Sequence, residues 1–90
     1  MHPGEILREE FLAPLGLSAG TVARAIHVPR TRIKRLFNEQ VNLTLNTALR
    51  LARYFVTTPQ FWLIIQNEYA IDRMSPGLRD ELQRIQPFSS

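Results

Sequence analysis

Apart from a group of basic residues near its middle, this 90-residue sequence has few side chains that could do chemistry. It contains two histidines and no cysteine, and it has neither a glycine-rich phosphate loop nor a His-Glu-x-x-His zinc motif. His2 and His27 are far apart in sequence and have no acidic neighbours suited to a metal site. We therefore expect no catalytic residue, no metal site and no cofactor, and an enzyme is the least favoured class of function.

The basic residues are concentrated between Arg24 and Arg53 and indicate a polyanionic partner. This window contains seven arginines and lysines and one acidic residue, Glu39, so it carries a net charge of +6 and the rest of the chain −3. One side of a predicted helix in this window presents Arg30, Thr31, Arg32, Lys34 and Arg35. A helix fits the DNA major groove, where arginine or lysine bonds guanine and threonine offers a hydroxyl and a methyl. We interpret this side as a DNA-reading face; a solvated basic face is the alternative.

Apolar residues at three- and four-residue spacing, together with Ser, Thr and Pro start signals, predict the helices that must position this face. The first expected helix begins at Pro3 and is stopped by Pro14 to Gly16. The next four run from Ser18 to His27, from Pro29 to Asn38, from Thr44 to Phe55, and from Thr58 to about Ile71. Ser75-Pro76 begins a weaker charged segment that reaches about Ile85. Residues 39–43 are expected to be a loop, because their alternation has no partner strand. The fold class is therefore all-α, with five helices and a short C-terminal helix or tail.

The second and third predicted helices have the spacing of a helix-turn-helix. Ala23 stands where two such helices cross closely, and five apolar residues fall at the positions that lock them together. Those residues are Val22, Ile26, Val28, Ile33 and Leu36. His27 occupies the turn, where glycine is usual because the turn needs a positive φ, a conformation that histidine tolerates better than most residues. Any short helical domain could show this apolar pattern, but its coincidence with the basic face favours DNA binding.

Candidate contacts to the DNA backbone lie at helix starts, because free backbone N–H groups and the helix dipole favour an anion there. The predicted set is Ser18, Ala19 and Gly20 at the second helix, Thr44 and Asn46 at the fourth, the side chains of Asn38 and Asn42, and the basic residue Arg32. For Thr44, a role as a helix cap alone is the alternative.

The fifth predicted helix carries more large apolar side chains than one buried face can hold. Those assigned to a dimer interface are Phe61, Trp62, Ile64, Ile65 and Tyr69. The alternative is that Phe61 or Trp62 fills the core beneath the first helix. A two-fold dimer would place two recognition helices roughly 34 Å apart, which predicts a palindromic operator.

Length and composition predict one folded unit with an appended tail. A helix-turn-helix domain is expected over residues 1–71, and a partly helical tail over residues 72–90. No apolar stretch approaches the roughly 20 residues that span a bilayer, and the first residues do not resemble a signal peptide. We therefore expect a cytoplasmic protein with no membrane partner.

Four sequence pieces carry a resemblance to a known family over His2 to about Ile71. They are His2-Pro3-Gly4-Glu5-Ile6-Leu7, Glu10-Phe11-Leu12 with Pro14-Leu15-Gly16, Thr47-Ala48-Leu49-Arg50-Leu51-Ala52, and Pro59-Gln60-Phe61-Trp62-Leu63 followed by Gln66. In this order and spacing they resemble the HigA-type antitoxins, within the lambda-repressor-like helix-turn-helix proteins. Three residues depart from the family pattern: His27 replaces the turn glycine, Pro29 a serine cap, and Ile64 an asparagine.

The resemblance implies a function. Members of this family pair with a small toxin, usually an mRNA-cleaving enzyme of the HigB type, and bind their own promoter as homodimers to repress both genes. It also implies that Arg30, Thr31 and Arg35 read bases and that Lys34 lies closer to the DNA backbone. Two alternatives remain open: a stand-alone Xre/Cro-type repressor without a toxin partner, and a helical module whose basic helix binds an acidic protein or RNA.

Overall fold

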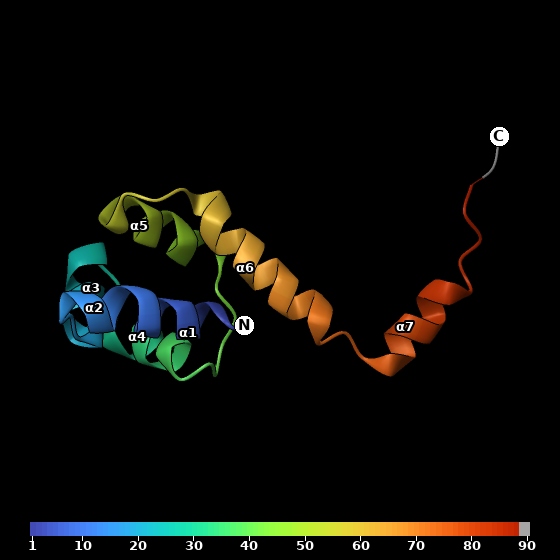
Figure 1. Ribbon diagram of the computed structural model, residues 1–90, viewed down its shortest axis with the longest axis horizontal. Coiled ribbons are helices and arrows are strands. Elements are labelled where there is room, and N and C mark those ends of the chain that lie inside the picture. Colours follow the sequence, from blue (N-terminus) through green and yellow to red (C-terminus); the bar gives the residue numbers. More distant parts are fainter. Residues whose placement is uncertain (89–90) are drawn as a thin grey trace.

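The computed structural model describes residues 1–88, and its elements are helices joined by short connections (Figure 1). They are α1 (Pro3–Ile6), the π-helical η1 (Leu7–Leu12), α2 (Ala13–Leu15), α3 (Ala19–Ile26), α4 (Arg30–Phe37), α5 (Leu45–Phe55), α6 (Pro59–Asp72) and α7 (Pro76–Gln83). The first three follow one another without a break. Within residues 1–88 there is no strand, so the all-α prediction and the loop over residues 39–43 are confirmed.

Hydroxyl side chains begin most of the later helices, as the start signals predicted. Ser18, Thr44, Thr58 and Ser75 each accept a hydrogen bond from the backbone N–H three residues further on. Helix α4 is the exception, because its N-cap is Pro29, which offers no side-chain acceptor, and its first helical residue is Arg30.

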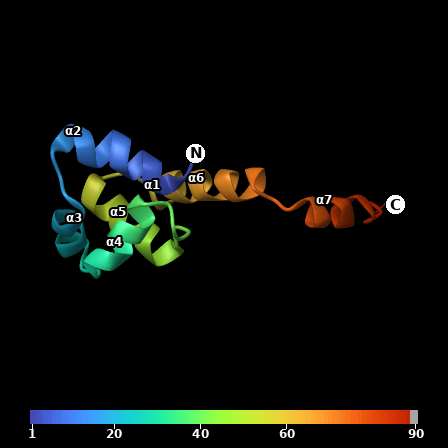
Figure 2. The ribbon, with the colours of Figure 1, turned by 90° about the horizontal axis from the view of Figure 1, so that it is seen from below.

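The core lies where the first helix, the α3–α4 pair, α5 and the start of α6 meet (Figures 1 and 2). Trp62 is fully buried there, with its ring centroid 5.0 Å from that of Phe11, and its indole N–H donates to the Thr57 hydroxyl at 2.8 Å. The assignment of Trp62 to a dimer surface is therefore wrong, because this chain's own side chains already enclose it.

The C-terminal helices extend away from this core. Helix α6 starts in the body and runs outward, and α7 lies beyond it, so the molecule measures 52 Å along its longest axis against 26 and 22 Å (Figures 1 and 2). Leu78 and Leu82, four residues apart on α7, are about half exposed. We refer to α7 and the outer half of α6 as the arm, and to the rest as the body.

Candidate nucleic-acid interface

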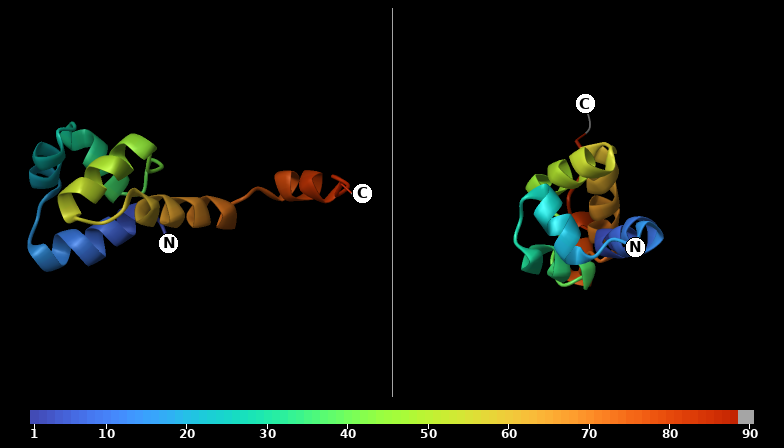
Figure 3. Two further views of the ribbon diagram at one scale, coloured as in Figure 1. Left: turned by 90° about the horizontal axis from the view of Figure 1, so that it is seen from above. Right: turned by 90° about the vertical axis from the view of Figure 1, so that its left-hand side faces the viewer.

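Helices α3 and α4 lie together at one end of the body and form the expected helix-turn-helix (Figure 3). His27 ends α3 with φ 63° and ψ 48°, so its predicted left-handed conformation is confirmed. A hydrogen bond from the Val28 N–H to the Ala23 carbonyl, at 3.0 Å, closes the turn. Val22 and Ile33 are completely buried between the helices, and this packing fixes the angle at which α4 leaves the turn.

The exposed side of α4 carries the predicted base-reading residues. Thr31 and Arg35 are four residues apart, so they share one helix face, and at 100° per residue this face lies opposite the buried Ile33 and Leu36. Arg30 lies to one side, because its side chain runs 3.7 Å from the position a Cβ would take on Gly20 in α3. The structure thus brings Thr31 and Arg35 together and places Arg30 beside a predicted backbone contact.

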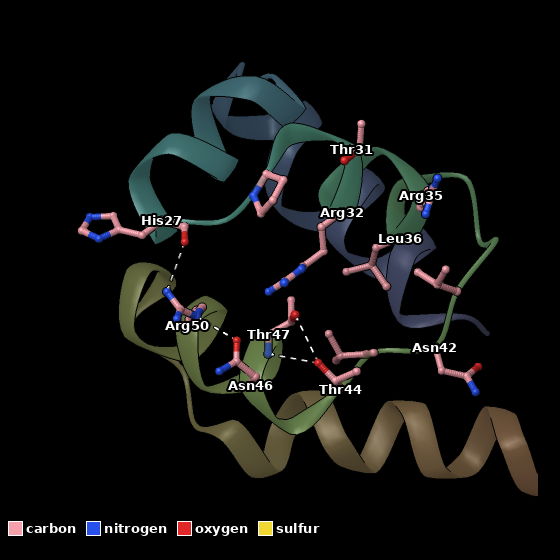
Figure 4. A pocket seen from close by; sticks show the side chains of 13 residues that line it. His27, Thr31, Arg32, Arg35, Leu36, Asn42, Thr44, Asn46, Thr47 and Arg50 are labelled. Carbon is pink, nitrogen blue, oxygen red and sulfur yellow. Dashed lines mark hydrogen bonds between the residues drawn. The ribbon is translucent and has the colours of Figure 1, made fainter.

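A groove of about 650 Å³ separates α4 from the start of α5 (Figure 4). Arg32 points from α4 across this groove towards α5. The predicted DNA contacts that line it are Thr31, Arg32, Arg35, Asn42, Thr44 and Asn46. Residues separated by up to fifteen positions in sequence therefore meet at one groove, while Lys34 and Asn38 are exposed without lining it.

The helix starts that flank α4 are organised by their caps. The Ser18 hydroxyl accepts from the Thr21 N–H at 3.1 Å, and the Thr44 hydroxyl accepts from the Thr47 N–H at 3.3 Å. The N–H groups of Ala19 and Gly20 belong to the first turn of α3, which has no acceptors within the helix. Ala19 itself is buried, with 7% of its surface exposed, so only its backbone is suited to contact DNA.

Two arginines from outside the motif hold the ends of both its helices. Arg50 of α5 donates through Nη1 to the Ile26 carbonyl at 2.8 Å and to the His27 carbonyl at 3.4 Å, at the end of α3. Arg8 of η1 donates to the Phe37 carbonyl at 2.7 Å, at the end of α4. Cations suit helix C-termini, where carbonyls lack helical partners. Neither role was predicted from the sequence; Arg50 lies inside one of the family pieces, whereas nothing in the sequence marked Arg8.

Arg8 also forms an ion pair with Glu39, the acidic residue of the basic window. Its guanidinium lies 3.7 Å from the Glu39 carboxylate, and a hydrogen bond to Glu9 at 3.0 Å raises the pKa of the Arg8 guanidinium. Glu39 is therefore directed towards η1 and not towards the basic residues of α4.

Within residues 1–88, none of the helices has the length and apolar character needed to cross a membrane. The same part of the chain holds no group of three His, Cys, Asp or Glu residues arranged to bind a metal ion.

Residues 7–62 match the model of a helix-turn-helix family. Virulence-associated protein I of Dichelobacter nodosus is 46% identical over the whole of this chain and 82% of that protein. Antitoxin HigA-1 of Vibrio cholerae is 42% identical over 94% of this chain and 80% of its own length. The chain belongs to the HigA-type helix-turn-helix family. The solved Pseudomonas aeruginosa antitoxin HigA with the higBA promoter superimposes with a TM-score of 0.88, at 36% identity, over 99% of this chain and 98% of that one.

The first family piece of this HigA-type chain positions the recognition helix. The His2 ring is buried, and its Nδ1 accepts from the Gly4 N–H at 2.9 Å. The His2 and Tyr69 rings pack in an edge-to-face arrangement with their centroids 4.7 Å apart. A Cβ on Gly4 would overlap the Leu36 carbonyl, so glycine lets α1 pass directly against the end of α4. These residues act on the predicted DNA-reading face through packing.

Gln66, at the end of the last family piece, has a similar role. It is 7% exposed, and its side-chain carbonyl accepts from the Leu43 N–H at 2.7 Å. The bond holds the loop that leads into α5, and so supports the Asn42 and Thr44 side of the groove. A buried amide paired in this way is costly to remove, because its backbone partner would be left without a bond.

The remaining residues predicted for the dimer surface divide into two groups. Phe61 and Ile64 are 40% and 56% exposed. Ile65 and Tyr69 are half-buried, and Tyr69 already packs on His2 and lies 4.8 Å below the Arg73 guanidinium. The outward side of α6 therefore begins with Phe61 and Ile64.

Proposed function

We propose that this chain is an antitoxin that, as a dimer, represses its own operon by sequence-specific DNA binding and neutralises a HigB-type mRNA-cleaving toxin. The observation that carries the proposal is the surface around α4. Thr31 and Arg35 face outwards, the capped start of α3 lies on one side, and the groove to α5 lies on the other. One helix aimed at base edges between two backbone-binding helix starts is the geometry by which helix-turn-helix proteins read the major groove.

In this proposal, Arg30, Thr31 and Arg35 read bases. The contacts to the DNA backbone are Ser18, Ala19, Gly20, Arg32, Lys34, Asn38, Asn42, Thr44 and Asn46. The position of Arg30 beside Gly20 makes it the base reader nearest to the backbone contacts of α3. Because operator DNA lies in the cytoplasm, we expect the protein to act there.

The dimer is formed in this proposal by exposed and half-buried apolar side chains of the C-terminal helices. Phe61, Ile64, Ile65 and Tyr69 supply the part on α6, and Leu78 and Leu82 extend it onto α7. Large apolar side chains left exposed together are typical of a protein interface. A two-fold arrangement of this surface gives a palindromic operator with half-sites one DNA turn apart.

The first test is fluorescence anisotropy with two labelled duplexes, one from the region upstream of this gene and one scrambled. At roughly physiological salt, we expect the upstream duplex to bind about 10³-fold more tightly or better. Equal and weak binding of both would instead support a basic face that binds an acidic protein or RNA.

Two neighbouring substitutions test the roles on α4. Arg35→Ala should weaken operator binding by about 1–3 kcal/mol and relax the preference at one base pair, because arginine reads a base edge. Lys34→Ala should weaken operator and scrambled DNA alike, because a phosphate contact carries no sequence information. Equal losses on both duplexes for both variants would contradict the assignment of Arg35.

The toxin is tested separately by expressing this chain with the product of the neighbouring gene. Rescue of growth and co-purification of the two proteins are expected for an antitoxin. Specific operator binding without rescue would identify a stand-alone repressor.

A further inference from the structure

Helix α3 ends in a conformation that its own sequence does not favour. His27 has φ 63°, a region in which a residue with a Cβ is less stable than glycine. This residue forms the turn between α3 and α4, so any relaxation of its backbone would change the direction in which α4 leaves. A contact from outside the turn that binds its carbonyls opposes such a relaxation.

Arg50 supplies that support. Its Nη1 donates to the carbonyls of Ile26 and His27, the two residues at the end of α3, and its side chain is half-buried between α3 and α5. Figure 4 shows it reaching from α5 to the His27 backbone. A charged donor to a carbonyl forms a stronger bond than a neutral donor does.

Arg50 is itself oriented by a residue of the proposed DNA surface. Its Nε donates to the side-chain oxygen of Asn46 at 2.9 Å, one turn earlier on α5. This bond determines the orientation of the amide, because the oxygen faces Arg50 and the NH2 group remains as the donor. Asn46 lines the groove next to α4.

We propose that Arg50 is a positioning residue for operator recognition. It links a phosphate contact at Asn46 to the His27 turn, so that the start of α5 and the recognition helix hold one relative geometry. Its guanidinium acts through the carbonyls that it binds. It therefore contributes to the sequence specificity of DNA binding more than to the charge attraction between protein and DNA. The inference rests on the proposed function, because it requires an operator to be read.

The test compares Arg50→Gln with Arg53→Gln on the same helix. Arg53 is exposed, and its substitution removes the same charge, so Arg53→Gln is the matched control. Affinities for the operator and scrambled duplexes are measured for both variants, with circular dichroism to establish that they are folded. Arg53→Gln should lower both affinities by similar small factors. Arg50→Gln should lower operator affinity about tenfold more than scrambled affinity, because a misplaced α4 loses base contacts while phosphate contacts persist.

Two further variants test whether Arg50 only stabilises the fold. Arg50→Lys keeps the charge but lacks the planar group that binds Asn46 and the carbonyls together, so it should retain scrambled-DNA affinity and lose specificity. His27→Gly removes the need to hold the turn, so adding it to Arg50→Gln should recover part of the lost specificity. Arg50→Lys also serves as the test should Arg50→Gln fail to fold.

The outcomes are distinct. Wild-type protein without operator preference would overturn the proposed function. Wild-type protein with operator preference, and an Arg50→Lys variant with an unchanged ratio of operator to scrambled affinity, would overturn the role of Arg50 alone. A parallel fall in both affinities for Arg50→Gln would likewise assign Arg50 to fold stability.

Discussion

The body and the arm differ in where their apolar side chains and helix ends find partners. In the body, Leu7, Ile33 and Trp62 are completely buried, and arginines from other helices hold the C-termini of α3 and α4. In the arm, Leu78 and Leu82 remain about half exposed although they share a face of α7. The core of the body is complete within one chain, whereas the arm, like Phe61 and Ile64 at the start of α6, presents apolar surface that only another molecule can cover.

This difference assigns separate tasks to the two regions. Reading DNA requires a recognition helix held at a fixed angle, and the body achieves this with buried contacts around α4. Dimerisation requires surface that stays available after folding, and in our proposal the arm supplies it together with Phe61 and Ile64. Substitutions in the buried core of the body should therefore act mainly on the free energy of unfolding, and those in the arm or at Phe61 and Ile64 mainly on self-association.

The largest effect is expected for Trp62→Ala. Removing a fully buried indole leaves a cavity and an unpaired Thr57 hydroxyl, and should lower the free energy of unfolding by about 3–5 kcal/mol. Ile64→Ala, two residues further along α6 and 56% exposed, should cost less than about 1 kcal/mol in the folded monomer. Urea denaturation followed by circular dichroism at low protein concentration measures both. A Trp62→Ala variant as stable as Ile64→Ala would show that the body does not depend on its core tryptophan.

An intermediate effect is expected for Gly4→Ala. The new methyl group would overlap the backbone carbonyl of Leu36, which cannot move without shifting α1 from α4, so a loss of about 1–3 kcal/mol is expected. Gly77→Ala in α7 is the matched control, because a Cβ there meets nothing within 4 Å and alanine favours the helix. Thermal unfolding should show a lower midpoint for Gly4→Ala and little change for Gly77→Ala, which lies outside the body. Similar midpoints would mean that α1 and α4 are not in direct backbone contact.

Much of the fold could be predicted because its signals are local. Ser18, Thr44 and Thr58 begin helices through bonds made three residues away, and the His27 turn follows from the spacing of its neighbours. The exposed side of α4 could be predicted for the same reason, since Thr31 and Arg35 share a face by periodicity alone.

The errors and omissions involve contacts between segments far apart in sequence. Trp62 and Ile64 have similar sequence surroundings, and only the position of Phe11 and the rest of the core determines which one is buried. Arg8 contacts a carbonyl 29 residues away, and Arg50 one 24 residues away. Periodicity describes one helix at a time, so it could not assign these two arginines to helix ends.

The smallest effect on unfolding is expected for Leu78→Ser combined with Leu82→Ser, and this pair tests the arm directly. Both side chains lie outside the body, so the free energy of unfolding of the monomer should change by less than about 0.5 kcal/mol. Trp62, the only tryptophan, reports this through its fluorescence because it is buried in the body. Self-association in sedimentation equilibrium should weaken at least about tenfold, since burying a leucine contributes about 1.5–3 kcal/mol. Asp80→Ser on the same helix controls for the loss of a surface residue. Unchanged dimerisation would restrict the interface to α6 and leave α7 for a different partner, such as the toxin.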